Sequence, residues 1–314
     1  MIRVFAPASV ANFGVGFDIL GAALEGPGDV VTARFTEEPG VRVSSITGDG
    51  GRLPRDPLRN TAAVAATAVL ELVRHKPKER SGLELTVEKG LPLSSGLGSS
   101  AASAAAGAWA AAVLLGIEDK TRLLRAVLLA EHAADGSWHG DNAYAALLGG
   151  LLLVPSSNPS HVVAPTPLPV PPTLRLVLVH PDFQLSTRES RAALPKKILL
   201  SQHTAQSAAL AELVAALYRG DVAAVGRCTG SDEIVETARA PLVKGYQTVT
   251  SEMRRAGALG VALAGAGPSL LGIAEDGAAP EAIADAAVKA WRMEGVEAAA
   301  RVHRVDTLGA RVVA

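Results

Sequence analysis

Residues 92–101 read PLSSGLGSSA, a run of mostly small residues between a predicted strand and a predicted helix. It follows a predicted β-strand at residues 83–88 and begins a predicted alanine-rich helix at residues 99–115. The first amides of a helix lack backbone partners and lie at the positive end of the helix dipole, so they attract anions. Gly96 and Gly98 allow the backbone to approach oxygen atoms, and serine hydroxyls stand at positions 94, 95, 99 and 100. The pattern predicts a phosphate-binding loop.

Three interpretations of this loop compete. A Walker A loop requires a lysine followed by serine or threonine, and the stretch contains no lysine. Gly96, Gly98 and Ala101 satisfy the G-x-G-x-x-A form of a dinucleotide site, which would indicate a nicotinamide-dependent oxidoreductase. That form expects an acidic residue about 20 positions later at a strand end, whereas Glu118 and Asp119 begin another predicted helix. For the loop taken alone, a small-residue helix start that only packs closely stays open.

Composition narrows the class of protein. A chain of 314 residues is long enough for two domains, and its 30 basic and 31 acidic side chains are scattered, which argues against a nucleic-acid or acidic-membrane partner. The uncharged segment at residues 91–117 is mostly Ala, Ser and Gly, so we expect a buried helix rather than a membrane span. The first residues lack the apolar core of a secretory signal, and the single cysteine suits a reducing compartment. We expect a cytoplasmic protein.

Periodicity predicts a mixed α/β first half and an α+β second half. Proline-rich residues 155–172 separate them, because so many prolines exclude a helix or an interior strand. We place the domains at residues 1–160 and 161–314. The predicted strands lie at residues 3–7, 30–35, 41–46, 83–88, 149–155, 174–181, 260–267, 269–275 and 296–305, and the predicted helices at residues 61–74, 99–115, 121–134, 142–148, 201–218 and 280–293.

The loop has two companions in the chain. Residues 6–21, APASVANFGVGFDILG, residues 92–101 and residues 265–269, GAGPS, resemble in the same order the three motifs of the galactokinase, homoserine kinase, mevalonate kinase and phosphomevalonate kinase (GHMP) superfamily. The first motif has the form that homoserine kinases carry. The resemblance implies a two-domain α+β fold, with an N-terminal α/β domain like ribosomal protein S5 domain 2, a ferredoxin-like C-terminal domain, and the active site in the cleft between them.

The resemblance also implies an ATP site and a magnesium site. It assigns Ser100 and Glu131 to Mg²⁺, and hard oxygen ligands of this kind suit that ion. Asn60 is either the N-cap of the helix that begins at Thr61 or a neighbour of the adenine. The residues assigned to ATP are Pro92, Leu93, Ser94, Ser95, Gly96, Leu97, Gly98, Ser99, Ser100, Ala101, Ala102 and Asn60.

The segment GSWHGDN at residues 136–142 resembles the part of homoserine kinases that borders the amino acid substrate. Taken alone, its Asp and Asn could simply cap the next helix. A zwitterion needs an acceptor for its ammonium group and a donor fork for its carboxylate, which fits an aspartate in the first motif and two arginines beyond residue 185. The residues assigned to the substrate are Asn12, Asp18, His139, Asp141, Thr187, Arg191 and Arg239.

The implied reaction is ATP-dependent phosphorylation of the side-chain hydroxyl of L-homoserine, in threonine biosynthesis. We expect Ser100, Glu131 and Asn142 to serve catalysis, with Asn142 orienting the hydroxyl and Asp141 helping to hold the ammonium, so that neither removes the proton. A sister kinase acting on mevalonate or another small alcohol stays open, as does the more distant oxidoreductase. A homodimer is compatible with so aliphatic a chain.

Overall fold

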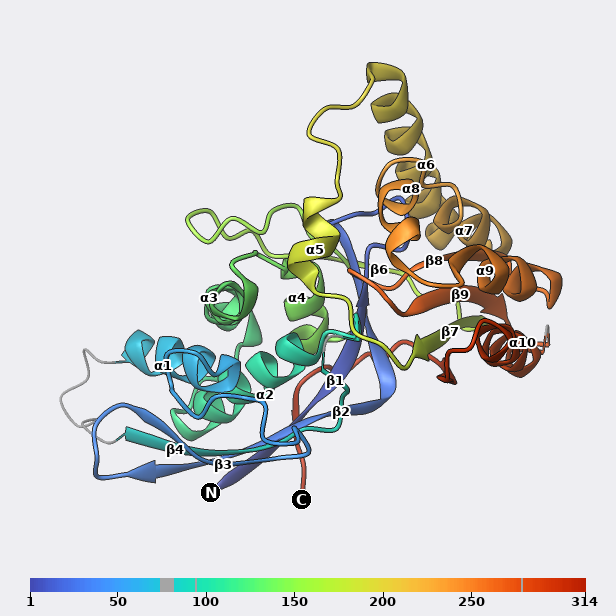
Figure 1. Ribbon diagram of the computed structural model, residues 1–314. Helices are drawn as coiled ribbons and strands as arrows, with labels where there is room; N and C mark the ends of the chain where they lie inside the picture. The colour runs from blue at the N-terminus through green and yellow to red at the C-terminus, as the bar shows by residue number, and fades with distance from the viewer. Residues whose placement is uncertain (74–81, 94, 278) are drawn as a thin grey trace.

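The computed structural model describes residues 1–73, 82–93, 95–277 and 279–314. The chain forms two β-sheets, each covered by helices (Figure 1). No helix in the described ranges is long and apolar enough to cross a bilayer, so the uncharged segment around residue 100 is a buried helix, as predicted.

The larger sheet has seven strands in the order β11-β1-β2-β4-β3, with β5 paired to β2 and β6 paired to β5. Its pairs are antiparallel except β3 with β4. A dinucleotide-binding fold requires a mainly parallel sheet, so this topology argues against the oxidoreductase. The strands are β1 (Ile2–Ala11), β2 (Leu20–Thr36), β3 (Val41–Thr47), β4 (Gly82–Glu88), β5 (Leu151–Leu153), β6 (Thr166–Leu168) and β11 (Arg311–Val312).

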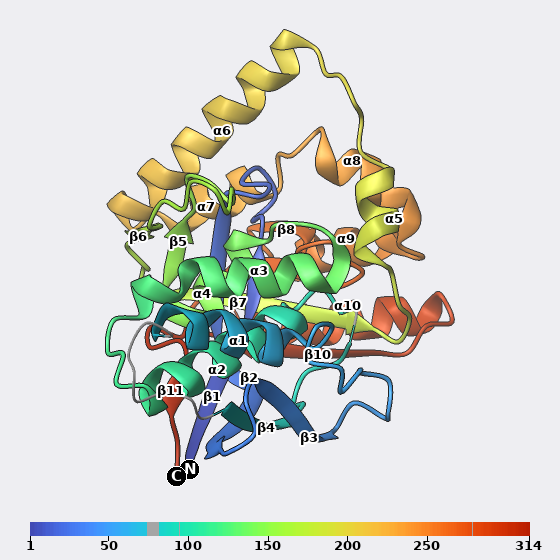
Figure 2. The ribbon, with the colours of Figure 1, turned by 90° about the vertical axis from the view of Figure 1, so that its left-hand side faces the viewer.

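Two layers of helices cover one face of this sheet (Figure 2). Helices α2 (Ser99–Leu114) and α4 (Gly140–Leu148) pack on β1 and β2, while α1 (Thr61–Val73) and α3 (Leu124–Asp135) pack on α2. A 3₁₀ turn, η1 (Lys120–Leu123), leads into α3. Helix α2 is alanine-rich because it is buried on almost all sides, and a Cβ on Gly107 would lie 2.4 Å from the Ala62 carbonyl oxygen of α1.

The smaller sheet is antiparallel, in the order β10-β7-β9-β8, and its two faces carry different cores. Leu176 and Leu178 of β7 (Leu174–Pro181) pack toward α6 (Leu200–Arg219), α7 (Val222–Thr229) and the larger sheet. Val177 and Val179 pack toward α9 (Tyr246–Arg255) and α10 (Pro280–Met293). This alternation is the period of two that a strand imposes. The remaining strands are β8 (Gly260–Leu263), β9 (Leu270–Glu275) and β10 (Ala298–His303).

The sequence pattern misses several short helices and strands. Helices α5 (Thr187–Ala192), α7, α8 (Val235–Arg239) and α9, the turn η2 (Ala240–Leu242), and strands β6 and β11 were not predicted. Position 74, at the end of one predicted helix, lies outside the described residues. The division at residue 160 stays a prediction; β6 and β11, which it assigns to the second domain, both pair within the larger sheet.

Candidate active site

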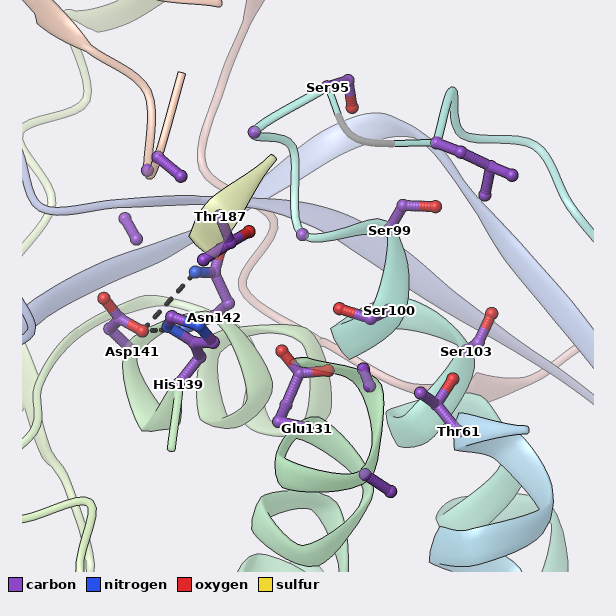
Figure 3. Close-up of a pocket in the computed structure, with 18 of the residues that line it drawn as sticks. Thr61, Ser95, Ser99, Ser100, Ser103, Glu131, His139, Asp141, Asn142 and Thr187 are labelled. Carbon is purple, nitrogen blue, oxygen red and sulfur yellow. Dashed lines mark hydrogen bonds between the residues drawn. The ribbon is translucent and has the colours of Figure 1, made fainter. Parts of the chain in front are cut away.

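A cavity of about 410 Å³ lies where both motif-bearing halves of the chain meet. Its walls come from the β1–β2 loop, the starts of α2, α4 and α5, the end of α8 and the β8–β9 loop (Figure 3). Sixteen of the predicted site residues line it, namely Asn12, Asp18, Asn60, Leu93, Ser95, Gly96, Gly98, Ser99, Ser100, Glu131, His139, Asp141, Asn142, Thr187, Arg191 and Arg239.

Four predicted ATP residues do not line the cavity. Pro92 is exposed, Leu97 packs beside the core that joins the two sheets, and Ala101 and Ala102 are fully buried in the helix interior. Their assignment to ATP stays a prediction. Ser94 lies outside the described residues.

The loop at residues 95–98 can adopt its path only with glycine at two positions. Gly96 has φ +76, and a Cβ there would lie 2.4 Å from the Ala264 carbonyl oxygen. Gly98 has φ +63, and a Cβ there would lie 2.0 Å from Ser9 Oγ. Both positions combine a left-handed backbone with close neighbours, which excludes an L side chain. The third motif supports the loop as well, because Ser269 donates a hydrogen bond to the Ser95 carbonyl at 2.5 Å.

Two oxygen-bearing side chains meet beside the first turn of α2. Glu131, buried at the end of α3, and Ser100 point into the same part of the cavity (Figure 3). A carboxylate and a hydroxyl suit Mg²⁺, which takes the rest of its shell from water and phosphates. Among the described residues no group of three His, Cys, Asp or Glu side chains could hold a metal ion.

A buried ion pair under the loop was missed from the sequence. Lys89 and Asp29 contact each other with almost no exposure. Lys89 also donates to the Ser99 carbonyl and to Ser103 Oγ, both at 2.8 Å, so it fixes the first turn of α2. Burial lowers the pKa of Lys89, and Asp29 opposes that shift. The residues are 60 positions apart, and the only local signal was a lysine directly after strand β4, close to the loop.

Asn60 caps helix α1. Its Oδ1 accepts from the Ala63 amide at 3.3 Å, and its Nδ2 donates to the Pro54 carbonyl at 3.0 Å. The residue also borders the cavity, so the cap and the neighbourhood of a nucleotide are compatible.

At the other end of the cavity, two predicted substrate groups pair with each other. Arg191 donates from Nη2 to Asp18 Oδ1 at 2.8 Å and from Nη1 to Asp18 Oδ2 at 3.1 Å. Asn12 holds this region, because its Oδ1 accepts from the Asp18 amide and its Nδ2 donates to the Gly265 carbonyl at 2.8 Å. Arg191 lies 3.3 Å from His139 Nδ1. The region therefore holds one acidic and one basic side chain, Asp18 and Arg191, at the same subsite.

Phe17, which the sequence did not single out, lies beside two guanidinium groups. The Cζ atoms of Arg239 and Arg191 are 5.1 Å and 5.6 Å from its ring centroid. Arg239 is buried and donates to the Ser190 and Gly265 carbonyls. An aromatic ring at this distance attracts a guanidinium group and so helps to hold both arginine side chains in place.

Asp141 and Asn142 begin helix α4 between the two ends of the cavity. Asp141 Oδ1 accepts from the Asn142 amide at 2.8 Å, and burial raises the pKa of Asp141 to about 6. Asn142 Oδ1 accepts from Ser9 Oγ at 2.9 Å. The carbonyl of Asn142 is thus occupied, and its Nδ2 donates to Asp141 Oδ1 at 3.5 Å. The second N–H of this amide group remains to face a ligand. Thr187, at the start of α5, faces the same region (Figure 3).

Comparison with known proteins agrees with this geometry. The family model of the GHMP kinases N-terminal domain matches residues 60–150, and that of the GHMP kinases C-terminal region matches residues 213–292. The chain is 43% identical to the homoserine kinase of Chloroherpeton thalassium over 92% of this chain and 91% of that protein. It is 40% identical to the homoserine kinase of Arabidopsis thaliana, over 99% of this chain and 84% of that protein.

A crystal structure of homoserine kinase from Cytophaga hutchinsonii superposes with a TM-score of 0.93 at 40% identity, covering 99% of this chain and 97% of the other. The fold, the phosphate loop and the family models define a GHMP kinase. The extent of the similarity is greater than the shared fold requires. The chain belongs to the homoserine kinase family. The oxidoreductase interpretation is therefore wrong.

Proposed function

We propose that the protein transfers the γ-phosphoryl group of ATP to the side-chain hydroxyl of L-homoserine, giving O-phospho-L-homoserine and ADP. One observation carries the choice of acceptor: a subsite containing paired acidic and basic side chains, Asp18 with Arg191, lies in the same cavity as the phosphate loop. An uncharged sugar would leave Asp18 and Arg191 paired only with each other, and mevalonate would use only the basic side chain. A small amino acid uses both.

Binding of zwitterionic L-homoserine would replace the ion pair between Asp18 and Arg191 by two ion pairs with the ligand. The carboxylate of the ligand would pair with the guanidinium of Arg191, next to Arg239, and its ammonium group would pair with Asp18. Asp141 lies on the same side and is ionised above its pKa of about 6. Because Asp18 and Arg191 neutralise each other beforehand, the empty subsite does not hold an isolated buried charge, which would be costly.

Transfer requires the acceptor oxygen to bond to the γ-phosphorus as the bond to the β,γ-bridging oxygen breaks. Asn142 would donate from Nδ2 to the acceptor oxygen, because Ser9 already occupies its carbonyl. The hydroxyl proton would pass to an oxygen of the transferred phosphoryl group, so no side chain need act as base. The amides at the start of α2 would stabilise the negative charge of the phosphates.

Mg²⁺ is the proposed metal cofactor, held by Ser100 and Glu131 together with the phosphates. When bound, it would neutralise charge on the β- and γ-phosphoryl oxygens. The chain's own part is to place a hydroxyl and a buried carboxylate beside the helix terminus that receives those phosphates.

A coupled ADP-release assay tests the proposal. Purified protein would be supplied with ATP, Mg²⁺ and, in separate reactions, L-homoserine, L-threonine, mevalonate, galactose or no acceptor. Turnover confined to L-homoserine is expected. Turnover with mevalonate or galactose and none with L-homoserine would keep the kinase family but overturn the roles given to Asp18 and Arg191. Repeating the active reaction with EDTA tests the metal, and undiminished turnover would exclude it.

We also propose that the enzyme acts in the cytoplasm, where ATP and Mg²⁺ are supplied, and that it forms a homodimer. Ile198, Leu199 and Leu200 are 43%, 68% and 79% exposed at the start of α6, and clustered exposed apolar side chains favour association. Sedimentation equilibrium tests whether the protein forms a homodimer. A monomer mass at all concentrations would reject it.

A further inference from the structure

Glu236 joins three elements of the smaller half of the molecule. It belongs to helix α8, and one of its carboxyl oxygens accepts from the Tyr246 hydroxyl of α9 at 2.6 Å. The two carboxyl oxygens also accept from the Leu263 amide of β8, at 2.8 Å and 3.1 Å. The carboxyl group is largely removed from solvent. A single side chain thus links two helices to a strand.

The strand that Glu236 holds leads directly into the substrate subsite. β8 is the edge strand of its sheet, so Glu236 supplies a partner that a further strand would otherwise provide. Two residues after Leu263, the Gly265 carbonyl accepts from Asn12 Nδ2 at 2.8 Å and from Arg239 Nη1 at 3.1 Å. Displacement of β8 would move the acceptor that holds both side chains.

Helix α8 also connects Glu236 to the substrate subsite, because Arg239 belongs to the same helix. Arg239 is the last residue of α8, three positions after Glu236, so the two side chains lie on neighbouring parts of the helix surface. Arg239 is held at one end by the position of α8 and at the other by Gly265. We propose that Glu236 is a positioning residue for substrate recognition, which fixes α8 to β8 and thereby sets the place of the Arg239 guanidinium. This inference rests on the proposed role of Arg239.

The charges around Glu236 make this link sensitive to pH. Burial raises the pKa of Glu236 to about 7, against the hydrogen bonds from Tyr246 and Leu263, which lower it. Asp232, which caps α8, raises that pKa further and Arg239 lowers it. Arg254 of α9 and Lys244 line the same hollow. Protonation would remove one acceptor and the negative charge near Arg239.

The experiment measures KM for L-homoserine and for ATP between about pH 6 and about pH 8 in the wild type and in Glu236→Gln. In the wild type, KM for L-homoserine should rise as pH falls through this range. In Glu236→Gln it should be raised about fivefold at the upper pH and should lose that part of its pH dependence. KM for ATP should change little. Asp141 titrates in both proteins, so the difference between the two profiles isolates Glu236.

Three further variants make the outcome decisive. Glu233→Gln removes an exposed carboxylate three positions earlier and should match the wild type. Tyr246→Phe removes a hydrogen bond that lowers the pKa of Glu236, so it should move the transition in KM to higher pH, which a purely structural role would not do. Arg239→Lys tests the premise: an unchanged KM for L-homoserine there would refute the proposed role of Arg239. An effect of Arg239→Lys together with a wild-type profile in Glu236→Gln and Tyr246→Phe would overturn the present inference alone.

Discussion

Residues 95–100, a continuous loop and helix start, form the proposed nucleotide end of the cavity, whereas the proposed acceptor end, around Asp18 and Arg191, consists of side chains from four separate segments. The loop is fixed by glycines packed against Ser9 and Ala264 and by the buried pair Lys89 and Asp29. The acceptor end is fixed by ion pairs and by the ring of Phe17.

Because of this contrast, substitutions at the two ends of the cavity should have different effects. A backbone site tolerates almost no change in shape, because each amide has a single position. A side-chain site can lose one group and retain the others, so a substitution there should change affinity for one substrate more than turnover. The nucleotide end would thus determine whether the enzyme works at all, and the acceptor end would determine what it works on.

The largest effect is expected from Gly98→Ala. A Cβ there would meet Ser9 Oγ at 2.0 Å and Asn142 Oδ1 at 3.0 Å, at φ +63. Either the loop or the Asn142 side chain must move, so we expect kcat/KM to fall about 100-fold or more, because small displacements of reacting groups cost about that much. Gly220→Ala is the matched control, since it has φ +72 with nothing within 4 Å of its Cβ position. Activity of Gly98→Ala within about threefold of the control would contradict the rigid loop.

Arg191→Lys should act on one substrate only. Lysine keeps the charge but loses the two-pronged donor that now pairs with Asp18. We expect KM for L-homoserine to rise about 30-fold, roughly 2 kcal/mol, with KM for ATP nearly unchanged. Arg188→Lys, on the exposed side of the same helix, supplies the control. A parallel rise in both KM values would remove the distinction between the two ends.

Asp141→Asn should alter how stability depends on pH. Burial raises the pKa of Asp141 from 3.8 to about 6, so between these values the native state binds more protons than the unfolded state, and this carboxyl makes the free energy of unfolding fall as pH rises. Relative to the wild type, the variant should gain on the order of 2 kcal/mol between about pH 4 and about pH 7. Urea unfolding at several pH values measures this. A constant difference across the range would refute the shifted carboxyl.

The smallest effect is expected from Phe17→Leu. Leucine retains apolar contact but removes the ring that lies beside Arg191 and Arg239. The loss of cation–π attraction should raise KM for L-homoserine about threefold and leave kcat unchanged. Phe35→Leu, at a 47% exposed position in β2, is the comparison variant. If Phe17→Leu lowers kcat instead, the ring serves the chemistry and not the binding of the acceptor.

The sequence indicates the nucleotide end well, because its parts are neighbours in the chain. PLSSGLGSSA contains the turn, the glycines and the helix start, and local geometry alone makes it an anion site. Helix α2 and strand β7 were also predicted, since each is a nearly continuous run of apolar or small residues, and both are buried along almost their whole length. The short helices α5 and α8 were not, because five or six residues cannot show a helical period.

The acceptor end is only partly visible in the sequence. Motif resemblance indicated Asp18 and Arg191 separately, but no pattern shows that residues 173 positions apart would form an ion pair. Phe17, Lys89 and Glu236 were missed for the same reason, since their roles depend on partners from distant segments. Such contacts are properties of the folded chain and have no period or spacing.

Strand β11 has a consequence for the order in which the molecule assembles during translation. Val4 of β1 pairs with Val312, more than 300 positions later in the chain. Both termini lie together in Figures 1 and 2. Until residues 311 and 312 emerge, this edge of β1 presents open backbone groups, which invite pairing with other chains. This edge of the sheet is therefore open to pairing with other chains for as long as β11 is absent, and chaperones that cover exposed strand edges would act on β1 during that interval.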